Sequence, residues 1–145
     1  MRQGFVRAVS RPVADVFDNL AGHPERWAQW FTVVRTCRYD GEPPFGAGSI
    51  RHLGLRGGIL ARERILAWDE PVGIFAYRVD ETNAPGVRAM LERWNVEALP
   101  GDRTRIRWLI AIDGAGPARF LLSAAHGRIN HVFHHAMRRL ERHAP

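Results

Sequence analysis

Apolar and polar residues alternate along three stretches in the second half of the chain, a pattern typical of antiparallel strands with one buried face. The stretches are 73–80, 88–99 and 103–112, and the last sets its apolar row opposite arginines. We therefore expect three neighbouring strands whose inward side chains form one wall of an interior. These inward residues are Phe75, Tyr77 and Val79, then Met90, Glu92, Trp94, Val96 and Ala98, then Ile106, Trp108, Ile110 and Ile112.

Four more strand-like segments lie earlier in the chain, separated by residues that favour turns. We predict these strands at 5–9, 34–40, 49–55 and 59–68. The connections are loops at 41–48 and 81–87, a turn at 56–58 and a hairpin connection at 100–102. The pattern leaves the inward phase of strands 49–55 and 59–68 open.

The helices are predicted from apolar spacings of three and four. Val13, Val16, Phe17 and Leu20 follow a Ser-Arg-Pro start and predict one short helix, and a second is expected at 24–30. A long helix is expected at 118–142. Its apolar face holds Leu121, Ala125, Ile129, Phe133, Ala136 and Leu140, and its polar face Arg128, His131, His135, Arg138 and Arg142.

The order of these elements indicates an α+β fold in which a curved sheet grips one long helix. Such an arrangement encloses an interior and favours a container for an apolar small molecule. The length of 145 residues suits a single domain, 1–145. No stretch approaches the roughly 20 apolar residues that span a bilayer. The N-terminus lacks a signal-peptide core, so we expect a cytoplasmic protein without integral membrane association.

Composition removes several classes of function. Cys37 is the single cysteine, which excludes an intrachain disulfide and a thiolate metal cluster, and we interpret it as a small buried residue. All 21 basic residues are arginine, so no lysine can form a Schiff base or bind phosphate in a P-loop. The net charge is +6, but the arginines are scattered, so we do not expect nucleic-acid binding.

We expect no metal and no cofactor. His131 and His135 are spaced i, i+4, but Val132 stands where the zinc-protease motif requires glutamate. The pair also shares its helix face with Arg128 and Arg138, which would repel a cation. We interpret this face as solvated surface.

The succession of segments resembles the START-like SRPBCC superfamily, in particular its bacterial polyketide cyclase/dehydrase-like members. The similar segments are 10–20 with the tryptophans at 27 and 30, 44–51, 62–71, the strand through Tyr77, 101–108 and the terminal helix. The resemblance covers nearly the whole chain. It implies the helix-grip fold: about seven antiparallel strands around the long C-terminal helix, two short helices after strand one, and a cavity between. Because members of the superfamily bind lipids, hormones and polyketides and only some catalyse, it implies no catalytic residue.

Glu92 is the leading candidate for chemistry, because it shares its face with apolar residues. A carboxyl in that setting has a raised pKa unless it is paired, and could act as a general acid or base in cyclisation or dehydration. The alternative is that Arg78 or Arg107 pairs with it at the cavity mouth. Tyr77 is the second candidate, although a buried tyrosine bonded to backbone is the simpler interpretation.

Glu63 is the third candidate, and with Tyr77, Glu92 and His52 it would form an interior polar patch. The expected ligand-binding residues are His52, Phe75, Tyr77, Met90, Glu92, Trp94, Trp108, Ile110, Leu121, Ala125, Ile129 and Phe133. We expect a monomer or homodimer that binds a hydrophobic or amphipathic small molecule, lipid- or polyketide-like, with or without cyclase/dehydrase activity. Two alternatives stay open: a non-catalytic carrier or sensor, and a protein-interaction domain with a filled interior.

Overall fold

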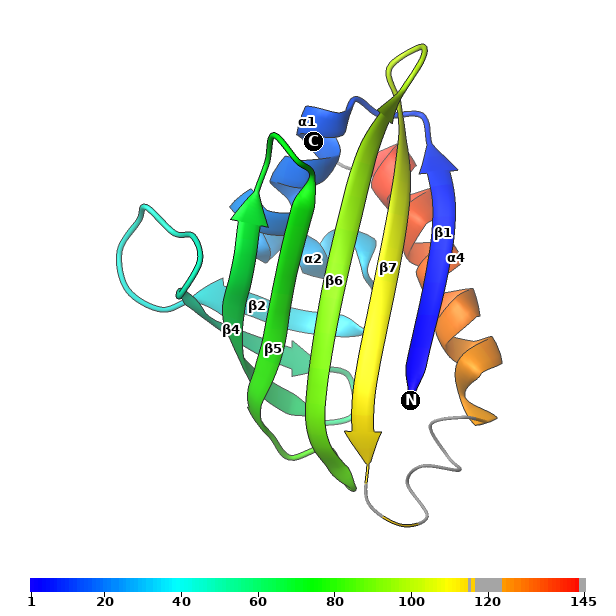
Figure 1. Ribbon diagram of the computed structural model, residues 1–145. Coiled ribbons are helices and arrows are strands. Elements are labelled where there is room, and N and C mark those ends of the chain that lie inside the picture. The colour runs from blue at the N-terminus through cyan, green and yellow to red at the C-terminus, as the bar shows by residue number, and fades with distance from the viewer. Residues whose placement is uncertain (115, 117–123, 144–145) are drawn as a thin grey trace.

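The computed structural model describes residues 1–114, 116 and 124–143. Seven antiparallel strands form one curled sheet in the order β1-β7-β6-β5-β4-β3-β2, and the helices lie against one side of it (Figure 1). The strands are β1 (Arg2–Val9), β2 (Val34–Tyr39), β3 (Ile50–Leu55), β4 (Leu60–Asp69), β5 (Ile74–Thr82), β6 (Val87–Leu99) and β7 (Arg103–Gly114). The predicted helix-grip architecture is confirmed.

The short helices after β1 are less regular than the apolar spacing predicts. They are α1 (Val13–Phe17), a π-helical turn (Asp18–Gly22), a 3₁₀ turn (Pro24–Arg26) and α2 (Trp27–Trp30). The long helix is α4 (His126–His143); the first part of the helix expected at 118–142 lies outside the described residues. No helix in the described part of the chain is long and apolar enough to cross a membrane.

The expected loop at 81–87 is shorter in the structure, because the strands on both sides extend into it. Glu81 and Thr82 continue β5 by pairing with Arg62 and Ala61 of β4. Val87 begins β6 opposite Gly114. The connection is thereby reduced to residues 83–86.

The inward phase of β4, left open by the sequence, changes at an irregularity between Ile65 and Ala67. Before it, Glu63 and Ile65 face inward and are buried, whereas Leu66 is 41% exposed. After it, Trp68 turns to the same side and packs against Tyr39, with ring centroids 5.9 Å apart. A bulge of this kind shifts the alternation by one residue.

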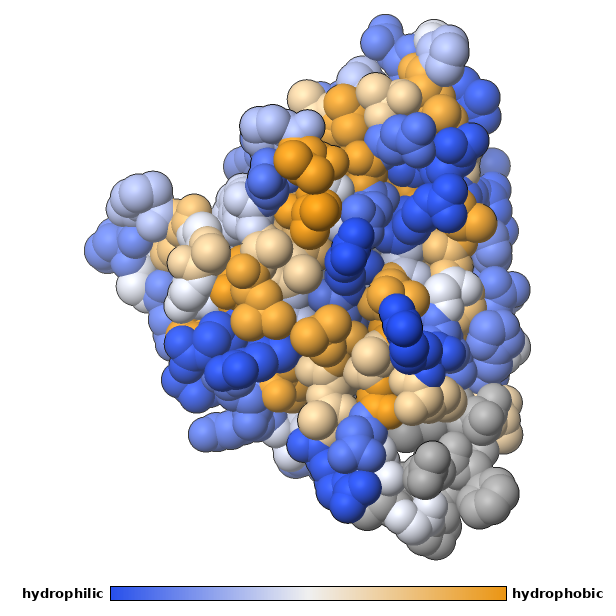
Figure 2. Space-filling view, in the orientation of Figure 1, coloured by the Kyte–Doolittle hydropathy of each residue, from blue (hydrophilic) through white to orange (hydrophobic). Residues whose placement is uncertain are grey.

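The residues that alternate with the inward-facing ones lie on the outer face of the sheet. Figure 2 shows polar side chains mixed with apolar ones across this face. Leu91 and Val6 are examples of its exposed apolar residues, and Arg93 and Arg107 of its charged ones.

Stacked aromatic rings form the core between the sheet and α4. Trp94 and Trp108 oppose each other on β6 and β7 and stack with centroids 5.0 Å apart. Phe133 of α4 covers Trp108 at 5.9 Å, and Phe5 of β1 lies 5.7 Å from Phe133. Each such pair contributes about 0.5–1.5 kcal/mol beyond the apolar area that it buries. The column fixes α4 against the sheet.

Candidate functional site: an internal cavity with a buried polar row

A cavity of about 460 Å³ lies between the inner face of the sheet, α2 and α4. This volume is within the roughly 300–1,000 Å³ of small-molecule sites. Its walls are mostly apolar. The expected residues that line it are Glu63, Tyr77, Met90, Glu92, Trp108, Ile110 and Ile129, and it is also lined by Trp27, Phe31, Val33, Val34, Leu53, Leu55, Ala61, Val79, Ile112 and Val132, among others.

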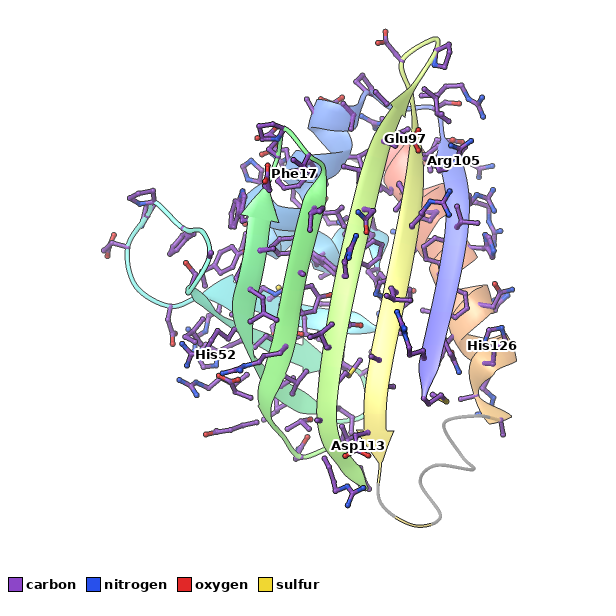
Figure 3. The ribbon with its side chains drawn as sticks, in the orientation of Figure 1. Phe17, His52, Glu97, Arg105, Asp113 and His126 are labelled. Atoms are coloured by element: carbon purple, nitrogen blue, oxygen red, sulfur yellow. The ribbon has the colours of Figure 1, made fainter. Side chains whose placement is uncertain are left out.

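The cavity has a buried inner end and a more exposed end, which we call the mouth. Glu63, Tyr77 and Glu92 are buried and belong to the inner end. The mouth is lined by Arg56, Ile59, Ala84, Val87 and Arg128, all exposed or half-buried. It lies where the β3–β4 turn, the β5–β6 connection and the first turn of α4 meet, at the end of the sheet where Figure 3 shows Asp113 and His126.

Three expected ligand-binding residues belong to the core instead of the cavity wall. Phe75, Trp94 and Phe133 are fully buried and pack against other side chains. Ala125 is half-buried and is not part of the lining, and Leu121 lies outside the described residues.

The expectation that His52 faces the interior is wrong. Its Nε2 lies 2.8 Å from Oδ2 of Asp40, and it borders a groove on the outer face of the sheet. On β3 the inward residues are Arg51, Leu53 and Leu55. Because side chains alternate along a strand, His52 faces outward. The hydrogen bond to His52 lowers the pKa of Asp40.

Arg51 takes the interior place expected for His52. It is 0% exposed, and its Nε donates a hydrogen bond of 2.8 Å to Oε1 of Glu63, its partner across β3 and β4. Burial is the largest influence on Arg51 and acts to lower its pKa, but the charge of Glu63, together with smaller effects of Cys37, Tyr77 and Tyr39, raises that pKa well above the usual value. Arg51 is therefore a permanent positive charge in the core.

Aromatic rings surround the Arg51 guanidinium. Its Cζ lies 4.3 Å from the ring centre of Tyr77, 4.8 Å from that of Trp27 and 5.4 Å from that of Phe75. Such cation–π contacts contribute about 2 kcal/mol or more when desolvated. They offset part of the cost of burying Nη1 and Nη2, neither of which has a hydrogen-bond partner in the described structure.

Glu92 lies beside this pair and directly opposite Tyr77 on the neighbouring strand. The Tyr77 hydroxyl accepts a hydrogen bond of 3.1 Å from Nε1 of Trp94. Its own proton is thus available to Glu92, and it acts to lower the pKa of that carboxyl. The alternative that Arg78 or Arg107 pairs with Glu92 does not hold: Arg78 Nε donates to Asp80 at 2.8 Å, and Arg107 is exposed on the outer face.

Burial is the main reason that the pKa of Glu92 rises from 4.5 to about 7, and the negative charge of Glu63 adds to it. A carboxyl with this pKa is about half protonated at neutral pH, so it can both take up and release a proton. Burial, followed by the charge of Glu92, raises the pKa of Tyr77 well above its usual value. Tyr77 therefore serves as a neutral hydrogen-bond donor.

The indole N–H of Trp108 lies beside these residues and has no hydrogen-bond acceptor among the described atoms. The indole lines the cavity, and its N–H is still near enough to Glu92 to lower the pKa of that carboxyl. The inner end thus combines one titratable carboxyl with two neutral donor groups, the Tyr77 hydroxyl and the buried Trp108 N–H, against otherwise apolar walls.

The remaining candidates lie away from the cavity. Cys37 is buried, as predicted, and burial raises its pKa to about 11. His131 is exposed on α4, and its ring centre is 6.5 Å from that of His135. Within residues 1–114, 116 and 124–143, no three histidine, cysteine or acidic side chains are grouped so that they could hold a metal ion.

Fold and cavity together define a helix-grip protein with an internal, mostly apolar chamber. Residues 5–145 match the family described as polyketide cyclase/dehydrase and lipid transport, and the chain belongs to this family. Uncharacterised proteins of Mycobacterium tuberculosis and Mycobacterium bovis are 35% identical over 127 residues, which cover 88% of this chain and 74% of theirs.

Solved structures share the fold at low sequence identity. The ZhuI aromatase/cyclase of Streptomyces sp. R1128 superposes with a TM-score of 0.74 at 22% identity, over 98% of this chain and 96% of that one. A START superfamily protein of Mycobacterium smegmatis gives 0.75 at 11% identity, with 99% and 96% covered. The two-domain aromatase/cyclase BexL gives 0.78 at 15% identity, with 97% of this chain and 46% of BexL covered. At these identities the likeness concerns the fold alone.

Proposed function

We propose that this protein binds an elongated, mostly apolar small molecule with an oxygen atom at its inner end, and that Glu92 exchanges a proton with that molecule. The observation that carries the proposal is the Glu92 carboxyl, with a pKa of about 7, in the wall of an apolar cavity. The unpartnered N–H of Trp108 would donate to the ligand oxygen. The family, whose description includes polyketide cyclases, dehydrases and lipid transport, supports a ligand of this kind.

Dehydration of a β-hydroxy ketone is the reaction that these groups fit best. The Glu92 carboxylate removes the proton from the carbon next to the carbonyl, and the electron pair forms the new carbon–carbon double bond. The protonated carboxyl then gives its proton to the departing hydroxyl, which leaves as water. Trp108 would stabilise the charge that develops on the carbonyl oxygen, and the cavity walls would hold the chain in a reactive geometry.

One observation favours a carrier without turnover as the second candidate. The charge of Glu63 is engaged by Arg51, which leaves Glu92 as the single unpaired carboxyl among the described lining residues. One carboxyl is enough to orient a ligand, but it must act as both base and acid if the protein is an enzyme. In either case we retain a cytoplasmic monomer or homodimer as the expected form.

Native mass spectrometry of protein purified from its own host, with analysis of an organic extract, tests the binding. A co-purifying apolar compound is expected. A clean apo mass together with no uptake from a panel of hydrophobic ligands would overturn the proposal.

Turnover is tested with a β-hydroxy ketone of about ten carbons, a length suited to the cavity volume, by the absorbance of the conjugated enone. Glu92→Gln should abolish water loss. Glu97→Gln, on the same strand but exposed and paired with Arg105 at the far end (Figure 3), should not. Binding without turnover in every variant would identify the carrier.

A further inference from the structure

We propose that the ligand carries a negatively charged group at its outer end, and that Arg56 and Arg128 bind this group at the mouth of the cavity. The inference rests on the proposed function and specifies its ligand as an amphipathic acid. The acidic group is a carboxylate or a phosphate, because the planar guanidinium group binds both with paired hydrogen bonds.

The two arginines come from distant parts of the chain and line the same cavity. Arg56 follows β3, and its position is fixed by two hydrogen bonds: its backbone N–H donates to Val33 O at 2.9 Å, and its Nε donates to Thr32 O at 2.6 Å. Its two terminal nitrogens form no hydrogen bond with any described residue. Arg128 is in the first turn of α4 and is exposed. It forms no hydrogen bond or ion pair with any other described residue.

No described carboxylate at the mouth neutralises the positive charges of Arg56 and Arg128. Among the described lining residues the acids are Glu63 and Glu92, and both are buried at the inner end. Two acids near the mouth have partners of their own: Asp113 lies 3.1 Å from Arg88, and Glu81 lies 3.9 Å from Arg62. An anion at the mouth would therefore meet two cations whose charge no described carboxylate neutralises.

The distance between the two ends of the cavity sets the length of the ligand. Val87 at the mouth and Glu92 at the inner end both line it and are five positions apart on β6, with the irregularity between Val87 and Ala89 in between. At about 3.3 Å per residue this corresponds to at most ~16 Å, because the irregularity shortens the advance of the strand. A fatty acid of about ten to twelve carbons suits that distance and the cavity volume.

Tryptophan fluorescence provides the measurement, since Trp27 and Trp108 line the cavity. Decanoate and methyl decanoate, which share an apolar chain and differ in charge, are titrated at pH 7. We expect the wild type to bind decanoate about fivefold more tightly than the ester, with a preference that declines as salt is added. Decyl phosphate in place of decanoate distinguishes the two acidic groups.

Arg56→Gln/Arg128→Gln should lose the preference for the acid and retain the affinity for the ester. Arg128→Gln alone should lose part of the preference, and it leaves the Arg56–Thr32 hydrogen bond intact. Arg107→Gln, which removes an exposed charge from the outer face, is the matched control and should behave as the wild type.

The outcomes separate this inference from the proposed function. Binding of neither compound by the wild type overturns the inference and contradicts the apolar binding cavity on which the proposed function also rests. Equal binding of acid and ester by the wild type, or an acid preference that survives in the double variant, overturns the role of the two arginines and leaves the cavity as an apolar binding site.

Discussion

Tyr77 and Glu92 occupy directly opposed positions on β5 and β6 and both face the cavity. This pairing places a phenol that stays protonated beside a carboxyl whose pKa is about 7. Because Trp94 donates to the Tyr77 oxygen, the orientation of the hydroxyl proton is restricted. The carboxyl therefore lies between the Tyr77 hydroxyl and the cavity.

Protein stability should decrease with rising pH through Glu92. Its pKa is about 7 in the folded state against 4.5 ordinarily, so between these values the folded state binds a proton that the unfolded state has released. The free energy of unfolding should then decline from about pH 4.5 to pH 7, by about 1.4 kcal/mol per unit of pKa shift.

Glu92→Gln should flatten this decline and be more stable than the wild type at pH 8. Urea unfolding across pH 4–8 measures the effect, with Glu97→Gln as the control that keeps the wild-type slope. A slope unchanged in Glu92→Gln would assign the titration to another group, Glu63 first.

Breaking the Arg51–Glu63 ion pair should strongly lower the free energy of unfolding, whereas replacing both residues by apolar ones should lower it little. Arg51→Met leaves the Glu63 carboxylate buried without its partner, which costs about 3–5 kcal/mol. The double variant Arg51→Met/Glu63→Leu should recover most of this loss, because it removes both charges. Urea unfolding of the two single variants and the double variant gives the coupling energy.

Arg38→Met is the matched control, since the Arg38–Asp40 pair is exposed and contributes about 1 kcal/mol or less. If breaking the buried pair costs no more than this, the pair is not the desolvated contact that the structure describes.

Core and cavity positions on α4 should respond differently to truncation. Phe133 is fully buried in the aromatic column, and Phe133→Ala should cost about 3–5 kcal/mol. The adjacent Val132 is half-buried and lines the cavity, so Val132→Ala should cost about 1 kcal/mol or less and change ligand affinity instead. Thermal unfolding and ligand titration distinguish the two; equal destabilisation would contradict the assignment of Val132 to the wall.

Gly73, between β4 and β5, should tolerate no side chain. Its φ is +82°, and an added Cβ would collide with the carbonyl oxygen of Val96. The backbone cannot yield, because Gly73 N–H donates to Asp69 O and Val96 N–H donates to Gly73 O, both at 2.8 Å.

Gly57 has a similar φ of +86° but open space around it, so Gly57→Ala should cost only the conformational strain of about 1 kcal/mol. Gly73→Ala should cost clearly more in urea unfolding. Similar losses for both variants would show that strain alone matters at Gly73.

The sequence predicts the long strands and most of their inward residues, because period-two alternation holds through most of their length. In β6 it is interrupted between Val87 and Ala89, and Ala98, expected to face inward, is exposed. Tyr77, Glu92, Trp108 and Ile110 line the cavity as their strands predict. Where the pattern is short or interrupted, prediction fails. In β4 the irregularity after Ile65 brings Trp68 inward, and no residue type in this segment predicts that irregularity.

Arg51 is the residue that sequence reasoning missed. Arginine is ordinarily a surface residue, so its residue type alone does not predict a buried position. A signal was present, since Arg51 alternates in phase with Leu53 and Leu55, which places all three on one face. The helix pattern places Arg128 on the polar face of α4 but does not predict that it lines the cavity. The position of the mouth is determined by tertiary packing.

The pairing of the first strand with the last has a consequence for the way the chain folds. Phe5 of β1 pairs with Trp108 of β7, across about a hundred intervening residues. Contacts so remote in sequence carry a large loop-closure cost, and proteins rich in them fold slowly. During synthesis β1 must wait for β7 to leave the ribosome, and until then an alternating, half-apolar strand has no partner. For most of the time that the protein is being made, this segment is therefore open to association with other nascent chains.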